Sequence, residues 1–273
     1  MFEWGGLRRP AVMGVVNVTP DSFSDGGRFL DADAAIAHGL ALVRDGADLL
    51  DVGGESTRPG ADPVDVDVEL GRVLPVVHAL ASETDVPVSV DTTKAAVAES
   101  ALGAGALVVN DVSAGRDPRM LEVVARAGAG YVAMHMRGEP RTMQDEPRYR
   151  DVVGEVGAFL VERLDAAHAA GIARRRLAAD PGIGFGKTVE HNLTLLAALG
   201  KLRERVAAPL VVGTSRKRFI AAVVGGGDRE PTAREEGTIA SVAWAVEHGA
   251  DVVRVHDVAP IARLSALVHE VAA

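Results

Sequence analysis

Polar and charged side chains follow short apolar stretches at intervals along the sequence, and their types are suited to binding and orienting a polar ligand. The sets are Asn17, Glu55–Arg58, Asp91, Asn110–Asp111, His135, Asp180, Ser215–Lys217, and Arg254 with His256. A single aspartate or asparagine at such a point would ordinarily cap the helix that follows. Arginine and histidine do not cap helix N-termini, and capping alone does not explain so many polar endings in succession. We therefore expect these side chains to meet in one site.

The last of these sets has the spacing of an anion site. Arg254 and His256 lie two residues apart, so on a strand both side chains point to the same face. The planar guanidinium of an arginine matches phosphate oxygens. The alternative is an ion pair between Arg254 and Asp257 or another nearby acid. The position after an apolar stretch favours the anion site.

Composition excludes several other chemistries. The chain has no cysteine, so disulfides, thiolate metal sites and a cysteine nucleophile are excluded. Its eight histidines show neither HxH nor HExxH spacing, which argues against a zinc enzyme. A net charge of -9 argues against general nucleic-acid binding, which needs a basic surface. No apolar stretch approaches the ~18 residues of a membrane span, and residues Met1–Pro10 do not resemble a signal peptide. We expect a cytoplasmic protein without a membrane partner.

The elements that would position the polar residues alternate between brief apolar strands and longer helices. The predicted strands are Ala11–Asn17, Asp48–Gly53, Pro87–Asp91, Ala106–Asn110, Gly130–His135, Leu177–Asp180, Leu210–Gly213 and Asp251–His256. Such alternation over 273 residues favours a single-domain (β/α)8 TIM barrel, in which the carboxyl ends of all the strands meet at one rim. An open doubly wound sheet would show the same alternation and remains the alternative.

The predicted helices carry apolar stripes, for example Val73, Val76, Val77 and Leu80. Pro75 lies inside that same predicted helix and predicts a bend or break. Two long segments rich in Gly, Ser, Thr, Asp and Pro, about residues 18–31 and 54–63, follow the first two strands. No domain boundary is evident, so we expect one domain over residues 1–273 with these two segments as active-site loops.

Longer motifs carry a family resemblance. Residues Met13–Gly27 resemble the opening signature of the dihydropteroate synthases, and Asp51–Gly60 resembles the second signature of that family. The further motifs, in the family's order, are Asp91–Thr92, Asn110–Ser113, Asp180–Lys187, Gly213–Phe219 and Arg254–Asp257. The resemblance extends from about Ala11 to the last helix. It implies a (β/α)8 barrel that joins 6-hydroxymethyl-7,8-dihydropterin diphosphate to p-aminobenzoate and releases pyrophosphate.

The resemblance implies three neighbouring subsites, of which the first binds the pterin. Asp180 would read the donor edge of the heterocycle, and Asp91 and Asn110 would complete the pocket. Lys217 would reach a pterin acceptor, and Met134 would form part of the wall. If pyrophosphate leaves first, in a dissociative displacement, Asp91 and Asp180 would also stabilise the positive charge on the pterin methylene.

The second implied subsite holds the pyrophosphate, for which Asn17, Arg58, Arg254 and His256 are the candidates. The resemblance also implies Mg²⁺ as a cofactor, and the amide oxygen of Asn17 is a hard ligand suited to that ion. Asp21 could assist when the first loop closes. Asp91, Asp180, Lys217, Arg254 and Asn17 are thus the implied catalytic residues.

The third implied subsite takes p-aminobenzoate, a flat anionic ring. Aromatic and proline rings would enclose it, and hydroxyl and cationic groups would hold its carboxylate. The candidates are Phe23, Thr57, Arg58, Pro59, Phe185 and Ser215. The resemblance further implies sulfonamide binding and a homodimer.

Two other functions share the barrel and its pterin-type carboxylates. A pterin-binding methyltransferase domain moves a methyl group from methyltetrahydrofolate to a corrinoid, and has no use for a pyrophosphate clamp. A non-catalytic pterin-binding paralogue is the other alternative. The complete motifs at Asn17, Arg58 and Lys217 favour the synthase over both.

Overall fold

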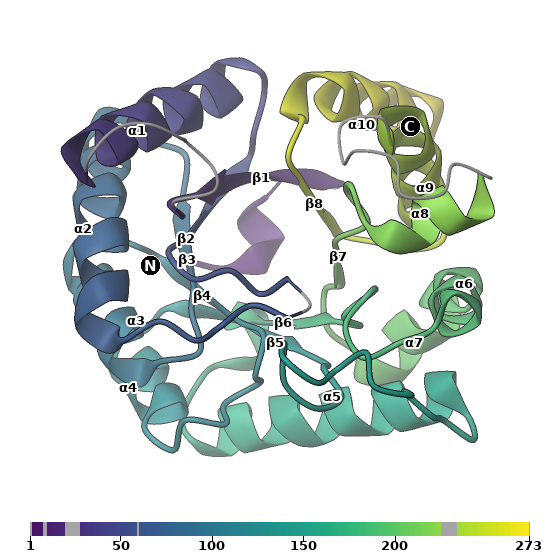
Figure 1. Cartoon of the computed structure of the whole chain (residues 1–273). Helices are drawn as coiled ribbons and strands as arrows, with labels where there is room; N and C mark the ends of the chain where they lie inside the picture. The colour runs from purple at the N-terminus through teal and green to yellow at the C-terminus, as the bar shows by residue number, and fades with distance from the viewer. Residues whose placement is uncertain (1, 8–9, 20–27, 59, 225–233, 273) are drawn as a thin grey trace.

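The chain forms a barrel of eight parallel strands surrounded by helices (Figure 1). The computed structural model describes residues 2–7, 10–19, 28–58, 60–224 and 234–272. The strands are β1 Ala11–Asn17, β2 Leu49–Gly53, β3 Val88–Asp91, β4 Val108–Asp111, β5 Gly130–Met134, β6 Leu177–Asp180, β7 Val211–Val212 and β8 Val252–Val255. These confirm the predicted TIM barrel, and the open doubly wound alternative is wrong.

The helices lie between the strands and cover the outside of the barrel. They are α1 Arg28–Arg44, α2 Val66–Glu83, α3 Ala95–Gly103, α4 Met120–Ala127, α5 Val152–Ala169, α6 Val189–Ala197, α7 Leu199–Val206, α8 Arg218–Val223, α9 Glu235–Glu247 and α10 Val258–Ala272. Two short 3₁₀ helices, η1 Trp4–Gly6 and η3 Arg174–Arg176, complete the described elements. Among the described residues, every helix is too short or too polar to span a lipid bilayer.

Strand pairing runs in the order β6-β5-β4-β3-β2-β1-β8-β7. The ring is completed at β7, the shortest strand, where Leu210 forms an isolated parallel bridge with Ala179 of β6. Asp251 reinforces this seam, because its carboxylate accepts from the backbone N–H of Leu210 at 3.0 Å and from Arg203 at 2.8 Å.

Alternate residues of most of the strands supply two separate cores. Val12, Leu50 and Val109 belong to the large cluster between the strands and the helices. Their chain neighbours Met13 and Leu49 belong to a second cluster inside the barrel. This period of two is that of a β-strand, and it explains why the strands are apolar throughout: both faces are covered.

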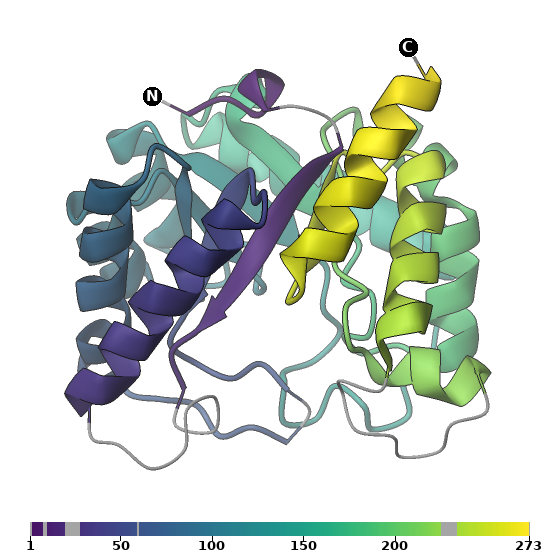
Figure 2. The same cartoon turned by 90° about the horizontal axis from the view of Figure 1, so that it is seen from above.

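One end of the barrel is closed by the N-terminal segment. Trp4 is 2% exposed, its indole N–H donates to the carbonyl of Arg176 at 2.9 Å, and Phe2 packs edge-on against it. In Figure 2 this segment lies at the top, and the loops that follow the strands lie at the bottom. The sealed end leaves the carboxyl ends of the strands as the open mouth.

The expected effect of Pro75 is wrong in part, because α2 continues through it as one helix. The proline ring is exposed, and so is Gly71, whose carbonyl would otherwise accept a hydrogen bond from residue 75. A carbonyl on the solvent face can bond to water instead, so the missing N–H does not break the helix.

Candidate active site

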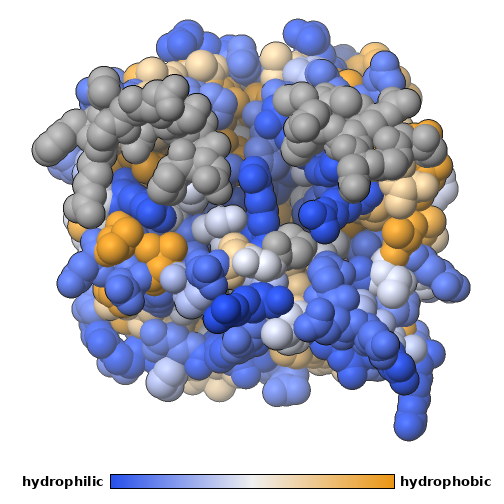
Figure 3. Space-filling model, in the orientation of Figure 1, coloured by the Kyte–Doolittle hydropathy of each residue, from blue (hydrophilic) through white to orange (hydrophobic). Residues whose placement is uncertain are grey.

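The register of the strands brings several predicted residues into one row at the mouth. Asn17 at the end of β1 is paired with Gly53 of β2, which is paired with Asp91 of β3, which is paired with Asn110 of β4. A Cβ atom at Gly53 would lie 3.5 Å from Cβ of Asp91, so this glycine leaves room between its neighbours. Figure 3 looks onto this end and shows polar side chains gathered at its centre.

Arg254 crosses the mouth and joins acids from two other strands. Its Nε donates to Oδ2 of Asp51 at 2.7 Å, and its Nη2 donates to Oδ2 of Asp91 at 2.9 Å. The side-chain amide of Asn110 donates to the same oxygen of Asp51 at 2.9 Å. Asp257, which was considered as a partner, pairs with Arg216 instead. Arg254 thus forms ion pairs with acids other than Asp257, and the remaining N–H groups of its guanidinium are compatible with an anion site.

Asp51 was missed in the sequence because it lies within the apolar stretch of β2. Its side chain is fully buried, and its Oδ1 has no hydrogen-bond partner among the described residues. A carboxylate in a strand that is otherwise apolar was the feature of the sequence that could have identified Asp51 as a site residue. Asp51 is the acid that holds Arg254 and Asn110 together.

The charges of Arg254, Asp51 and Asp91 at the centre of the mouth shift the pKa values of Arg254 and Asp91. Burial raises the pKa of Asp91 to about 7, against the opposing effect of Arg254, and the nearby Asp51 raises it further. Burial alone would lower the pKa of Arg254, but Asp51 and Asp91 outweigh burial and raise it. The arginine thus stays charged, while Asp91 can gain or lose a proton near neutral pH.

Asp180 and Lys217 form the opposite side of the mouth. Asp180 is 6% exposed, and its Oδ1 accepts from the backbone N–H of Gly182 at 2.7 Å. Burial raises the pKa of Asp180, and Lys217 opposes that shift. Burial lowers the pKa of Lys217 to about 8, while Asp180 opposes that change. The ammonium of Lys217 donates to the carbonyl of Ile183 and lies 4.8 Å from the centre of the Phe185 ring.

An apolar wall completes this side. Met134 belongs to a buried cluster with Val112, Met136 and Met143, and Phe185 packs against it. Met134 is also paired in register with Asp180. The structure therefore places the predicted pterin-wall residue and the predicted p-aminobenzoate ring contact in one apolar cluster. A cavity of about 520 Å³ reaches the mouth and is lined in part by Thr57, Asp91 and Met136.

Ser215 and His256 lie next to each other near the end of β8. The Oγ of Ser215 is 3.0 Å from Nδ1 of His256 and accepts from the backbone N–H of His256 at 3.3 Å. Burial, then the positive charge of Arg254, lowers the pKa of His256 to about 3. The imidazole is therefore neutral at pH 7. Arg216 has a φ of 59°, a left-handed conformation that is costly for arginine and is typical of functional loops.

The loop that follows β6 is organised by a lysine that sequence reasoning did not assign. Lys187 is 3% exposed, and its ammonium donates to the carbonyls of Gly182 and Phe185 at 2.9 Å. It also lies 3.0 Å from Nδ1 of His135. Burial lowers the pKa of Lys187 to about 7, opposed by Asp180. Lys187 thereby fixes the loop that carries Phe185. Its place at the end of the Asp180–Lys187 motif was the feature of the sequence that could have identified it as a site residue.

Two of the remaining predicted residues lie on the loop after β2. Thr57 is half-buried and Arg58 is exposed, and both belong to the loop after β2. Arg58 is close enough to His256 to contribute to the lowering of its pKa. Phe23, Asp21 and Pro59 lie outside the described residues.

Comparisons with known proteins agree on the family. The model of the family described as "Pterin binding enzyme" matches residues 13–256. The dihydropteroate synthase of Mycobacterium leprae is 52% identical over 252 residues, which cover 90% of this chain and 88% of that protein. The chain belongs to the dihydropteroate synthase family. The family resemblance of the sequence is thus confirmed.

Solved structures of dihydropteroate synthases have the same architecture. That of Xanthomonas albilineans with 4-aminobenzoic acid is 50% identical and has a TM-score of 0.91, with 97% of this chain and 94% of that chain covered. The same enzyme in complex with 7,8-dihydropteroate is 46% identical with a TM-score of 0.87 and the same coverage. The chain is therefore a transferase of this family, and neither the methyltransferase nor the non-catalytic alternative is favoured.

Proposed function

We propose that this chain joins 6-hydroxymethyl-7,8-dihydropterin diphosphate to p-aminobenzoate, giving 7,8-dihydropteroate and pyrophosphate. One observation carries the proposal beyond family membership. Acids and amides from β2, β3, β4 and β6, a half-buried lysine after β7 and an arginine from β8 surround one mouth with an apolar wall. Such a mouth offers partners for a flat polar heterocycle and for an anionic leaving group.

The pterin subsite lies between Asp180 and Asn110. A buried carboxylate can accept two hydrogen bonds from the amino and ring N–H groups of a pterin, and such a site disfavours analogues without those groups. Lys217 would donate to a ring acceptor. Met134 supports the flat face of the ring from within the apolar cluster.

The leaving pyrophosphate would be bound by Arg254 and His256 together with Asn17 and Arg58. A neutral His256 can donate to a phosphate oxygen through Nε2–H, because its Nδ1 is already oriented by Ser215. This binding would stabilise the negative charge that forms as the carbon–oxygen bond breaks.

Magnesium fits this subsite as an ion held mainly by its substrate. Among the residues that the structure describes, no group of three His, Cys, Asp or Glu side chains is placed to hold a metal. Asn17 offers one amide oxygen at the mouth, and Mg²⁺ commonly takes its other ligands from phosphate and water. The bound ion would neutralise the departing pyrophosphate. Asp21 remains the second candidate ligand.

The p-aminobenzoate subsite would lie between Phe185 and the loop after β2. Phe185 offers a ring face, and Thr57 and Arg58 would cover the site. Ser215 would offer its hydroxyl to the carboxylate by turning away from Nδ1 of His256, which it contacts in the unliganded site. Phe23 and Pro59 are proposed to complete it. An arylamine is nucleophilic in its neutral form, so no general base is required for its attack.

In the reaction, the bond between the pterin methylene and the diphosphate oxygen would break first. Both bonding electrons leave with pyrophosphate, and the methylene carries a positive charge delocalised into the pterin ring. Asp91 and Asp180 stabilise that cation by their position at the mouth. The amine nitrogen of p-aminobenzoate then bonds to the methylene carbon and releases a proton to solvent.

Product analysis tests this function. The purified chain with both substrates and Mg²⁺ should form 7,8-dihydropteroate and pyrophosphate in equal amounts, detected by mass spectrometry and a phosphate-coupled assay. His256→Ala should raise the KM for the diphosphate substrate while leaving the affinity for free 6-hydroxymethylpterin unchanged. A wild-type chain that releases no pyrophosphate when p-aminobenzoate is present would reject the proposal.

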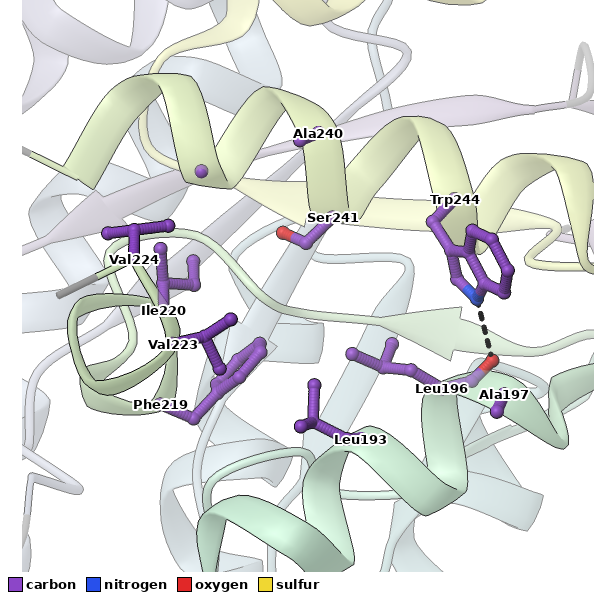
Figure 4. A pocket seen from close by; sticks show the side chains of 11 residues that line it. Leu193, Leu196, Ala197, Phe219, Ile220, Val223, Val224, Ala240, Ser241 and Trp244 are labelled. Atoms are coloured by element: carbon purple, nitrogen blue, oxygen red, sulfur yellow. Dashed lines mark hydrogen bonds between the residues drawn. The ribbon is translucent and has the colours of Figure 1, made fainter.

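We also propose that the chain forms a homodimer through helices α6, α8 and α9. A groove of about 350 Å³ lies between them, and no charged side chain lines it (Figure 4). Trp244, Val223 and Leu193 are 48%, 54% and 43% exposed there. Homodimer interfaces are more apolar than the rest of a protein surface, and aromatic side chains are enriched in them. A second copy would bury the same apolar side chains on both partners.

The mass in solution tests this assembly. Analytical ultracentrifugation of the wild-type chain should give twice the mass of the monomer, and Val223→Glu should give a folded monomer. A wild-type monomer at tens of micromolar would contradict the proposed dimer. We propose the cytoplasm as the location of the protein, to be checked by cell fractionation.

A further inference from the structure

A half-buried lysine beside the mouth holds two carboxylates that none of the three subsites uses. Lys94 follows Asp91 by three residues, in the segment between β3 and α3. Its ammonium donates to Oε2 of Glu69 at 2.5 Å and to Oε2 of Glu55. Glu69 lies in the first turn of α2, and Glu55 begins the loop that carries Thr57 and Arg58.

The cluster contains two carboxylates and one ammonium. The side chain of Glu69 is fully buried, and its Oε1 has no hydrogen-bond partner among the described residues. Burial alone would lower the pKa of Lys94, but the hydrogen bonds that it donates to Glu55 and Glu69, with their negative charges, outweigh burial and raise it. Lys94 therefore stays charged, and Glu69 depends on it for compensation of its own buried charge.

Glu55 uses its second oxygen to close the base of the loop. Oε1 accepts from the backbone N–H of Val64 at 3.3 Å, so one carboxylate joins residue 55 to residue 64. Arg72 of α2 fixes the first residue of the loop, because its Nη1 donates to the carbonyl of Gly54 at 2.8 Å. Thr57 and Arg58 lie between the two ends that Glu55 joins.

The same lysine thus links the segments that follow two neighbouring strands, β2 and β3. It belongs to the short segment that begins at Asp91, and through Glu55 it holds the loop after β2. We propose that Lys94 is a positioning residue that couples the end of β3 to residues 54–64. It thereby determines the positions of Thr57 and Arg58 relative to the pterin subsite. This inference rests on the proposed function, in which those two residues contact p-aminobenzoate.

Glu55 and Glu69 should respond differently to substitution. Glu55 is 19% exposed and can turn to water, so its replacement frees the loop without stranding a charge in the interior. Loss of Lys94 leaves the fully buried Glu69 uncompensated, so it also costs folding stability. The double substitution Lys94→Met with Glu69→Gln removes that buried charge and isolates the effect on the loop.

Steady-state kinetics with both substrates test the coupling. Glu55→Ala and the double variant should fold as the wild type does and raise the KM for p-aminobenzoate about tenfold, the effect of losing a charge-assisted hydrogen bond. The KM for the diphosphate substrate should change less than twofold. Glu99→Ala, which removes an acid paired with Arg119 and Arg126 on the protein surface, is the matched control and should change neither.

Hydrogen exchange provides a readout that does not depend on activity. The amide of Val64 should exchange faster in Glu55→Ala and in the double variant than in the wild type, and at the wild-type rate in Glu99→Ala. Unchanged exchange, or a fall in kcat with no change in the KM for p-aminobenzoate, would overturn the inference. If the wild-type chain has no synthase activity but the amide of Val64 exchanges faster in the variants, the proposed function is rejected. The role of Lys94 and Glu55 in positioning residues 54–64 would still be supported.

Discussion

Replacing Arg254 with glutamine should destabilise the fold as well as the reaction. The arginine side chain is 22% exposed, and the two carboxylates that it contacts, Asp51 and Asp91, are 0% and 11% exposed. Removing one partner of a buried ion pair typically costs about 3–5 kcal/mol, because the remaining charge is left uncompensated. We expect Arg254→Gln to lower the free energy of unfolding by about that amount at pH 8.

The loss should depend on pH in a defined direction. In the folded protein the pKa of Asp91 is raised to about 7 from a reference value of 3.8, so the folded state binds more protons than the unfolded state between those values. Stability therefore falls as pH rises through this range. Without Arg254, which opposes the shift, the pKa of Asp91 would rise further. The loss of stability with rising pH would then extend above pH 7. The variant should thus lose less stability relative to the wild type at pH 5 than at pH 8.

Urea denaturation at both pH values measures these differences. Asp51→Asn should recover part of the loss in the Arg254→Gln background, because it removes the fully buried charge, and the two effects should not add. Arg119→Gln, which removes an exposed cation, is the control for loss of a positive charge. A loss of under about 1 kcal/mol at pH 8, or strict additivity of the two substitutions, would refute the reasoning.

Three further predictions concern the rest of the fold and the site. Trp4→Ala should lower the free energy of unfolding by about 3–5 kcal/mol in urea, because it empties the sealed end of the barrel. Gly182→Ala should abolish turnover, since its Cβ would overlap the carbonyl oxygen of His135, whereas Gly71→Ala on the exposed face of α2 should retain it and raise stability by roughly 0.5–1 kcal/mol. Calorimetric affinity for the pterin should fall as pH drops below about 7, where Asp91 gains a proton, and an equal affinity at pH 6 and pH 8 would contradict this.

The strands could be predicted from the sequence because both of their faces are buried. Each predicted strand end falls within two residues of the observed one, since a continuous apolar stretch ends where the first polar residue reaches the surface or the mouth. The same reasoning located the row of Asn17, Asp91 and Asn110, because every parallel strand ends at the same rim.

The charge network could not be predicted in the same way. Asp51 and Arg254 are 203 residues apart, and their contact depends on the barrel closing between β1 and β8. Lys94 looks like an ordinary surface lysine in the sequence, and the motif that ends at Lys187 does not show what its ammonium contacts. Only the packed structure shows which carboxylates and carbonyls surround the two lysines. Pro75 was misjudged because its place off the stripe of Val73, Val76 and Val77 was not considered, although that stripe puts residue 75 on the side of the helix that faces water.

A crystal structure of the chain with 6-hydroxymethyl-7,8-dihydropterin, pyrophosphate, Mg²⁺ and p-aminobenzoate would test the central proposal most directly. We predict the pterin between Asp180 and Asn110, pyrophosphate within hydrogen-bond distance of Arg254 and His256, and p-aminobenzoate against Phe185. Ligands bound away from the carboxyl ends of the strands, with the mouth still holding only solvent, would contradict it.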